Sequence, residues 1–404
     1  MINIKQHPII IIILALGVFV TNAQADDTRF LDLFAERQKE CREGKRYSCN
    51  SLGNIYADGL GGVKKDRQKA KQVYQRANLL HQKACDAGTV FACFDLVTSH
   101  LYGRGVKRNH AKAKQIYQKA ISYYQKKCNG GDMDVCFNLG RAYAHSTGLG
   151  VEHDKANRLY EKACNGGQMD ACYNLGLSYR RDSQGVKQDL QKALQLEEKA
   201  CNGGQITACE ELALMYGIGD YVKEDNHKAI KFYQKACDGG KASSCNLLAL
   251  FYRGGEHVKR DFKKANQLFQ KACDSGYIRA CHNLGRSYEN GSGVKRDYYK
   301  ANSLFLKACN SKKVYVEGAC FSLGYSYATG SGVQKDHQKA NQLYQKGCDD
   351  GDMGACFALA TTYKDGMGVR QDKNRAKRIY GVACDGGNQG GCNVYRELNE
   401  QGIK

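Results

Sequence analysis

The stretch CHNLGRSYENGSGVKRDYYKANSLFLKAC, residues 281–309, decides the fold. In its first part Cys281, Leu284 and Tyr288 stand at positions i, i+3 and i+7, which lie on one face of an α-helix. Gly291 follows and breaks the helix, because glycine adopts turn conformations that other residues avoid. This part therefore predicts one helix that ends at a glycine turn.

The second part of the stretch predicts another helix. Ala301, Phe305 and Cys309 stand at i, i+4 and i+8, again on one face. Each unit of the chain is thus a pair of antiparallel helices. We call helix A the one that carries the second cysteine of a pair, and helix B the one that ends near the first cysteine of the next pair. Gly285 in helix A is small enough for helix B to approach closely.

Cysteine pairs mark the repeat along the chain. The partner follows eight residues after the first cysteine, except in one pair with a spacing of eleven. The ten pairs are Cys41–Cys49, Cys85–Cys93, Cys128–Cys136, Cys164–Cys172, Cys201–Cys209, Cys237–Cys245, Cys273–Cys281, Cys309–Cys320, Cys348–Cys356 and Cys384–Cys392. Zinc ligands favour two to four intervening residues, so metal binding suits this spacing poorly. We predict a disulfide within each pair, from the end of one helix B to the start of the next helix A.

A glycine three residues after the first cysteine recurs in nine of the ten pairs. Gly167 is the example in the pair Cys164–Cys172, and it stands where a helix C-terminus favours a residue with positive φ. Lys312 takes this position in the eleven-residue pair, which predicts a different loop there.

The N-terminal residues predict export. Lys5 precedes an apolar run over residues 9–20, and Ala23-Gln24-Ala25 follows it. This order is typical of a secretory signal peptide, here residues 1–25. The run has 12 residues, fewer than the roughly 20 that a membrane-spanning helix needs. An exported chain meets oxidising conditions, which agrees with disulfides in the rest of the protein.

Residues 26–404 are predicted to form a single repeat domain. We count nine A–B helix pairs, with a leading helix over about residues 28–42 and a closing helix over about 391–401 as caps. The first two B helices are predicted to be longer by seven or eight residues, because segments 69–85 and 112–128 continue the helical pattern. That extension is about two turns.

The repeat resembles a known family. Segments NLGRAY at 138–143 and NLGRSYENGSGVKRDYYKANSLFLKA at 283–308 are similar to the Sel1-like repeat, a relative of the tetratricopeptide repeat. With its cysteine junctions the chain resembles the cysteine-rich subset, the Helicobacter cysteine-rich protein family. The resemblance implies an all-α, right-handed α/α solenoid with a disulfide at each repeat junction. It also implies an exported protein that binds partners through a concave groove, in a family where some members are described as penicillin-binding or weakly β-lactamase-like.

Motifs for catalysis are missing from the chain. Serine β-lactamases use S-x-x-K on a helix, together with S-D-N and K-T-G. The last two strings are absent, and the S-x-x-K string at Ser292–Lys295 falls in a predicted turn. The nine histidines after the signal region are scattered without metal-ligand spacing, so we interpret them as surface residues. We expect no catalytic residue, no metal site and no cofactor.

The chain is strongly basic, with a formal net charge of +20. Lysine and arginine recur in the turns between helices A and B, as in VKKD and VKRD. An exported protein meets little nucleic acid, and the chain has no nucleic-acid recognition motif, so we expect no nucleic-acid partner. An acidic peptide or an anionic envelope polymer suits the charge better. The alternative is a solvated basic surface without a specific partner.

Two positions of helix A point away from its core face and are neighbours, namely the second and fifth residues after the cysteine. Asparagine at the former can both donate to and accept from a peptide backbone. Arginine at the latter can fork onto a carboxylate. The candidate groove residues are Asn138, Arg141, Asn174, Asn283 and Arg286. The alternative is that they are ordinary polar residues near a helix N-terminus.

Three functions remain open from the sequence. The leading hypothesis is a periplasmic or secreted scaffold that binds peptides, proteins or anionic envelope components through the groove. The second is a hydrolase that acts on β-lactams or peptidoglycan fragments, which rests on the family resemblance alone. The third is a structural spacer without a specific ligand.

Overall fold

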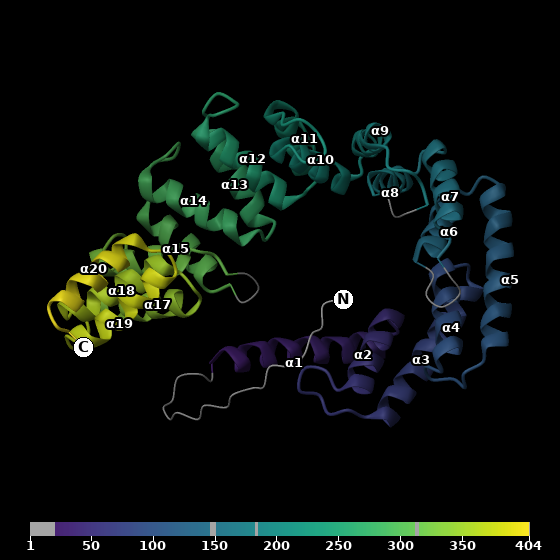
Figure 1. The fold of residues 1–404 in the computed structure, drawn as a ribbon, viewed down its shortest axis with the longest axis horizontal. Coiled ribbons are helices and arrows are strands. Elements are labelled where there is room, and N and C mark those ends of the chain that lie inside the picture. Colours follow the sequence, from purple (N-terminus) through teal and green to yellow (C-terminus); the bar gives the residue numbers. More distant parts are fainter. Residues whose placement is uncertain (1–20, 146–150, 182–184, 312–314, 404) are drawn as a thin grey trace, which may run out of the picture. The chain divides into compact units, whose positions relative to one another are not determined.

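The computed structural model describes residues 21–145, 151–181, 185–311 and 315–403. Within these ranges the regular elements are 20 α-helices, without a strand (Figure 1). The chain divides into two compact units, residues 1–188 and 189–404, and each unit is described by itself. Residues 1–20 of the predicted signal peptide lie outside the described part, and residues 21–25 open the first helix.

The first unit contains eight of the helices. They are α1 (Thr21–Arg42), α2 (Arg46–Asp58), α3 (Arg67–Asp86), α4 (Val90–Tyr102), α5 (His110–Asn129), α6 (Met133–His145), α7 (His153–Asn165) and α8 (Met169–Arg180).

The second unit contains the other twelve. They are α9 (Leu190–Asn202), α10 (Ile206–Ile218), α11 (Asn226–Asp238), α12 (Ala242–Gly254), α13 (Phe262–Asp274), α14 (Ile278–Asn290), α15 (Tyr298–Cys309), α16 (Ala319–Thr329), α17 (His337–Asp349), α18 (Met353–Asp365), α19 (Lys373–Asp385) and α20 (Gln389–Glu400).

The helices alternate as the sequence predicts. The even-numbered helices from α2 to α18 are A helices and the odd-numbered helices from α3 to α19 are B helices, while α1 precedes them and α20 follows. Helices α3 and α5 each have 20 residues, against 12 or 13 in the other B helices. The predicted extension of the first two B helices is therefore confirmed, and it lengthens each of them by about 10 Å.

The aspartate at the end of the basic turn is the N-cap of helix B. Asp261 caps α13 by accepting a hydrogen bond from the backbone N–H of Lys264 at 2.9 Å. Such an N-cap stabilises a helix by about 1 kcal/mol. The ammonium group of Lys264 also lies 4.2 Å from the ring centroid of Tyr252 on the preceding A helix, a cation–π contact. Lys264 thus donates to the N-cap of helix B with its backbone and covers an aromatic ring of helix A with its side chain.

Small residues let the two helices of a pair pack closely. A Cβ atom at Gly285 of α14 would lie 2.6 Å from the ring of Phe305 on α15, which is closer than packed atoms approach. Phe305 is fully buried, and Ala301 beside it is 1% exposed. The predicted role of glycine in helix A, close approach of helix B, is therefore what the structure shows.

A disulfide joins the two cysteines of each pair, so the predicted disulfide at every repeat junction is confirmed. At the junction of α7 and α8, the Cα atoms of Cys164 and Cys172 are 4.6 Å apart, within the roughly 4.4–6.8 Å that a disulfide bridges. Gly167 between them has a φ of 92°, as its position after helix B predicts. The junction is thus a tight corner that is closed covalently.

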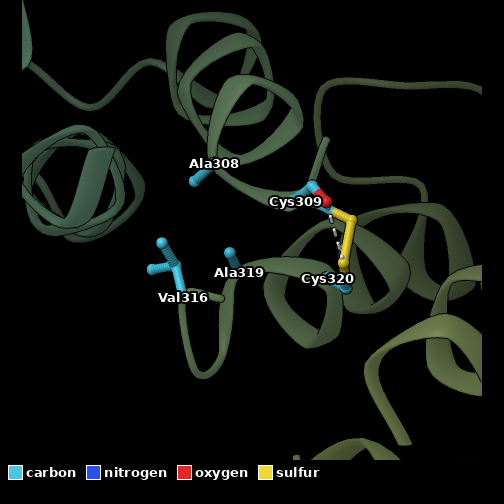
Figure 2. Packing of buried hydrophobic residues seen from close by; sticks show 5 residues of the cluster. All are labelled: Ala308, Cys309, Val316, Ala319 and Cys320. Carbon is cyan, nitrogen blue, oxygen red and sulfur yellow. Dashed lines mark hydrogen bonds between the residues drawn. A yellow bond between two sulfur atoms is a disulfide. The ribbon is translucent and has the colours of Figure 1, made fainter. Parts of the chain in front are cut away.

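The eleven-residue junction has a small core of its own (Figure 2). Val316 is buried and packs with Ala308 and Ala319 beside the disulfide of Cys309 and Cys320. The longer loop therefore adds apolar contacts to the covalent tie.

The same junction begins helix α16 in a different way. Gly318 has a φ of 78° and directly precedes the helix. Its backbone N–H donates to Oδ2 of Asp352 at 2.9 Å, which links this junction to the next one. Lys312, the residue that predicts a different loop, lies outside the described residues.

An asparagine ties helix B to the turn of the next helix pair. Nδ2 of Asn266 on α13 donates to the carbonyl oxygen of Ser292 at 2.7 Å. Gly293 follows Ser292 with a φ of 70°, and a Cβ atom there would lie 2.5 Å from Cβ of Phe262. Equivalent bonds, at 2.7 to 2.8 Å, run from Asn78 to Arg104, from Asn302 to Ser331 and from Asn341 to Met367. We call this arrangement the asparagine–turn bond.

Two B helices of the second unit have an aliphatic residue where the asparagine stands. They are α9 with Leu194 and α11 with Ile230. The turns that follow them carry Tyr221 and His257 in place of the glycine. Tyr221 keeps a φ of 63°, which costs a non-glycine residue energy. The asparagine and the glycine are therefore replaced together.

None of the helices within the described ranges combines the length and the apolar character that a bilayer crossing requires.

Candidate functional site on the A helices

The five predicted groove residues fall in both units. Asn138 and Arg141 lie on α6 and Asn174 lies on α8, in the first unit. Asn283 and Arg286 lie on α14, in the second unit. Both arginines are exposed and the three asparagines are half-buried.

In the first unit Arg141 and Asn174 contact residues of the chain itself. The Arg141 guanidinium lies 4.6 Å from the ring centroid of Phe91 and 5.6 Å from that of Phe137. Asn174 donates from Nδ2 to the backbone carbonyl of Asp170 at 2.7 Å, one turn earlier in the same helix. That bond is the local bonding that asparagine commonly makes near a helix N-terminus.

In the second unit Asn283 connects two A helices. Its Nδ2 donates to Oδ1 of Asn246 on α12 at 3.0 Å. Its own Oδ1 accepts from Nη1 of Arg253, also on α12, at 3.2 Å. Asn283 therefore faces the neighbouring repeat and not open solvent. The helical pattern within one repeat does not predict this contact, because the contact joins two repeats.

Arg253 is a candidate residue that the sequence patterns do not single out. It stands eight residues after Cys245, one turn beyond the position of the predicted arginines. Burial, and secondarily the charge of Arg286, lowers the pKa of Arg253. Within the described part of the chain neither guanidinium has an acidic partner within 4 Å. We call Arg253, Asn283 and Arg286 the arginine pair site.

A histidine extends the arginine pair site toward α16. Nε2 of His282 lies 3.4 Å from Oγ of Ser322, and the ring packs 5.5 Å from that of Phe305. Burial first, and then the charges of Arg286 and Arg253, lower the pKa of His282 to about 4, against an opposing effect of Asp352. The imidazole is therefore neutral at pH 7, and the positive charge of the site comes from the two arginines.

The interpretation of all nine histidines as surface residues is wrong for two of them. His81 is fully buried and His100 is 9% exposed. His81 stands four residues before Cys85, where α13 has Phe269 four residues before its own cysteine. The cysteine register therefore marks His81 as a core position, a signal that the sequence contains.

Side chains from two other helices lie against the buried His81. Its Nε2 lies 2.9 Å from Nδ2 of Asn50 on α2, and its Nδ1 lies 3.2 Å from Oδ2 of Asp95 on α4. Burial lowers the pKa of His81 to about 4 and raises the pKa of Asp95 to about 6. The described residues contain no cluster of three or more histidine, cysteine, aspartate or glutamate side chains arranged to hold a metal.

The S-x-x-K string does not have the helical context of a β-lactamase. Ser292 to Lys295 form the turn between α14 and α15, as the sequence predicts. The carbonyl of Ser292 accepts the asparagine–turn bond from Asn266. This serine therefore belongs to a structural turn, not to the first turn of a catalytic helix.

Tandem helix pairs, a disulfide at each junction and side chains shared between successive A helices define a helical repeat protein. A family model described as Sel1 repeat matches the chain nine times, and the chain belongs to that family. The matches cover residues 46–89, 91–126, 134–168, 170–205, 206–241, 242–277, 278–312, 318–352 and 354–388. The predicted resemblance is thereby confirmed.

Solved structures agree with this family. A Sel1 repeat protein from Oxalobacter formigenes is 25% identical, with a TM-score of 0.55 over 79% of this chain and 90% of that one. A protective antigen of uropathogenic Escherichia coli is 22% identical, with a TM-score of 0.52 over 92% of this chain and 83% of that one. Cysteine rich protein B of Helicobacter pylori is 32% identical over 33% of this chain and 95% of its own, with a TM-score of 0.26. No curated protein matches the chain.

Proposed function

We propose that this Sel1 repeat protein is an exported scaffold that binds peptides or protein segments through carboxylates. The arginine pair site carries the proposal: Arg253 and Arg286 lie on consecutive A helices with Asn283 between them. A guanidinium presents a fork of donors that matches a carboxylate. The half-buried position of Arg253 strengthens such a bond, because less water competes for it.

The disulfides indicate an oxidising environment, such as the periplasm or the extracellular space. The apolar run at residues 9–20 supports export through a signal peptide. An anionic envelope polymer would also bind to the positively charged arginines. The net charge of +20 supports long-range attraction of either partner. We favour a peptide or protein because the proposal rests on two neighbouring guanidiniums, which match a single carboxylate, and not on the net charge of the chain.

A peptide array tests the proposal. The oxidised chain from residue 26 is applied to peptides in pairs that differ only by Asp→Asn or Glu→Gln. We expect acidic members to be retained and the Arg253→Gln/Arg286→Gln variant to lose them by about tenfold or more, since a hydrogen bond to a charged group contributes about 1.5–3 kcal/mol. The control Lys263→Gln/Arg279→Gln removes the same charge from exposed positions of the same unit. Equal losses in both variants would indicate a solvated spacer with diffuse charge.

The hydrolase alternative has its own measurement. We expect a chromogenic cephalosporin to be hydrolysed at the background rate by the native chain and by Ser292→Ala alike, because Ser292 lies in a turn. A saturable rate that Ser292→Ala abolishes would establish the hydrolase instead.

A further inference from the structure

A cleft lies in the first unit, between helices α1, α2 and α3. It has a volume of about 690 Å³, within the range of roughly 300–1,000 Å³ that is usual for small-ligand sites. Leu52 of α2 and Val73 of α3 give it an apolar floor, and Tyr56 forms a wall. The hydroxyl of Tyr56 accepts a hydrogen bond from Nε2 of Gln38 on α1 at 3.0 Å. We call this space the α1–α3 cleft.

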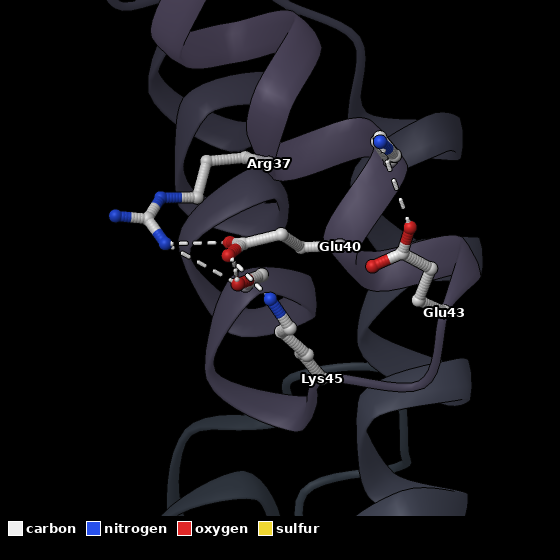
Figure 3. A network of polar contacts seen from close by, with 6 residues as sticks. Arg37, Glu40, Glu43 and Lys45 are labelled. Atoms are coloured by element: carbon white, nitrogen blue, oxygen red, sulfur yellow. Dashed lines mark hydrogen bonds and ion pairs between the residues drawn. The ribbon is translucent and has the colours of Figure 1, made fainter.

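Helix α1 is fixed in place, so the cleft has defined walls. The disulfide of Cys41 and Cys49 ties its end to α2. Glu40, next to Cys41 in the sequence, forms ion pairs with Lys45 at 2.9 Å and with Arg37 at 2.8 Å, as Figure 3 shows. A hydrogen bond from Ser48, and then the one from Lys45, lowers the pKa of Glu40 to about 2.

The described residues that line the cleft include three cations and no acid. Arg42 of α1 and Arg76 of α3 stand at its rim with Lys69. Nη2 of Arg76 donates to the backbone carbonyl of Arg42 at 2.8 Å, which orients this guanidinium across the mouth. The ammonium group of Lys69 forms an ion pair with the carboxylate of Asp66 at 3.6 Å. Among the described residues the two guanidiniums have no acidic partner within 4 Å.

An exposed leucine adds apolar surface beside these cations. Leu79 of α3 lines the cleft and is 59% exposed. It lies thirteen residues after the N-cap Asp66, beyond the length at which the shorter B helices reach their cysteine. The extension of α3 therefore places an aliphatic side chain next to Arg76. This combination suits a ligand with an acidic group and an aliphatic part.

An equivalent cleft between α5, α6 and α7 shows that the charge is particular to the first one. Tyr143 and Lys155 take the places of Tyr56 and Lys69 in a space of about 580 Å³. Glu152 also lines that space and pairs with Lys155 at 2.6 Å. The cleft between α5, α6 and α7 thus has the same architecture with its charge largely neutralised, and it serves as an internal control.

We propose that the α1–α3 cleft binds a carboxylate that is carried on an aliphatic body. The two guanidiniums would receive the carboxylate, and Leu79, Leu52 and Val73 would contact the aliphatic part. A fatty acid and a peptide that ends in an aliphatic residue share this chemistry. The site lies in the first unit and is independent of the arginine pair site, so it does not rest on the proposed function.

Calorimetric titration of the oxidised chain from residue 26 tests this proposal. The probes are octanoate and octanamide, and acetyl-Ala-Ala-Leu with a free or an amidated C-terminus. We expect at least one free acid to bind saturably, with at least tenfold weaker binding of its amide. Which acid binds identifies the source of the carboxylate.

Variants locate the binding. Arg42→Gln/Arg76→Gln should weaken it at least tenfold, whereas Lys126→Gln in the equivalent cleft and Arg253→Gln/Arg286→Gln should leave it unchanged. Arg42→Gln alone keeps the hydrogen bond of Arg76, which is made to the backbone of residue 42, and should weaken binding several-fold in a folded protein. Equal binding of acid and amide, unchanged binding in Arg42→Gln, or no saturable binding of either acid at millimolar concentration would overturn the proposal.

Discussion

Gly167 and Gly254 differ in the backbone conformation that they hold. Gly167 follows α7 with a φ of 92°, and a Cβ atom there would meet nothing within 4 Å. Gly254 ends α12 in helical conformation, with equally open space. Space is therefore no obstacle at either position, and only conformation separates them.

Alanine substitutions should show that difference. We expect Gly167→Ala to lower the free energy of unfolding by about 1–2 kcal/mol, because an L-residue is strained in the left-handed region. Gly254→Ala should be neutral or stabilising by up to about 1 kcal/mol, because it restricts the unfolded chain. Urea unfolding followed by circular dichroism measures both, and equal effects would contradict the assignment of Gly167 to a strained position.

His282 makes stability depend on pH. Its folded pKa of about 4 lies below the ordinary value of 6.5, so the unfolded chain binds the proton first as the pH falls. The stabilising contribution is complete above about pH 6.5 and is lost as the pH falls toward 4, by on the order of 3 kcal/mol. We expect His282→Gln to flatten this part of the stability profile.

The exposed His227 supplies the control for that measurement. His227→Gln should leave the slope of unfolding free energy against pH as it is in the native chain. If His282→Gln and His227→Gln give the same slope between pH 6.5 and 4, His282 is not the group that titrates.

At the scale of helices and turns, the asparagine–turn bond couples one repeat to the next. Asn266 is 6% exposed and donates to the carbonyl of Ser292. Asn266→Ala leaves that carbonyl without its partner, and we expect a loss of about 1–3 kcal/mol. Hydrogen exchange should quicken in the turn between α14 and α15, whereas Asn290→Ala at the exposed last residue of α14 should change little. Unchanged exchange in Asn266→Ala would show that the bond does not hold the turn.

The helical elements follow from local patterns, so the sequence predicts them well. The two-turn extension of α3 and the glycine with positive φ after helix B depend on residues within one repeat. Asn283 and His81 depend instead on contacts with other helices, such as that of Asn283 with Asn246, 37 positions away, and that of His81 with Asn50, 31 positions away. For this reason the sequence patterns single out Asn283 and Arg286 as candidates but not Arg253, and they place His81 wrongly on the surface.

At the scale of the whole molecule, stability is distributed over many local ties. A repeat array is held by contacts between neighbours, and each eight-residue disulfide loop adds about 2.5 kcal/mol in the chain-entropy model. We expect non-reducing peptide mapping to join Cys164 to Cys172 in the native protein. Cys164→Ser/Cys172→Ser should lose hydrogen-exchange protection in α7 and α8 while α18 keeps it. A cross-link from Cys164 to a distant cysteine would contradict the repeat register.

The arginine pair site is the central functional claim, and a double-mutant cycle tests it most directly. An acidic peptide selected on the array and its Asp→Asn or Glu→Gln form are each titrated against the native chain and against Arg253→Gln/Arg286→Gln. If the carboxylate bonds to these arginines, the two changes are coupled, and we predict a coupling energy of about 1.5–3 kcal/mol. A coupling energy near zero, with both changes weakening binding independently, would contradict the claim.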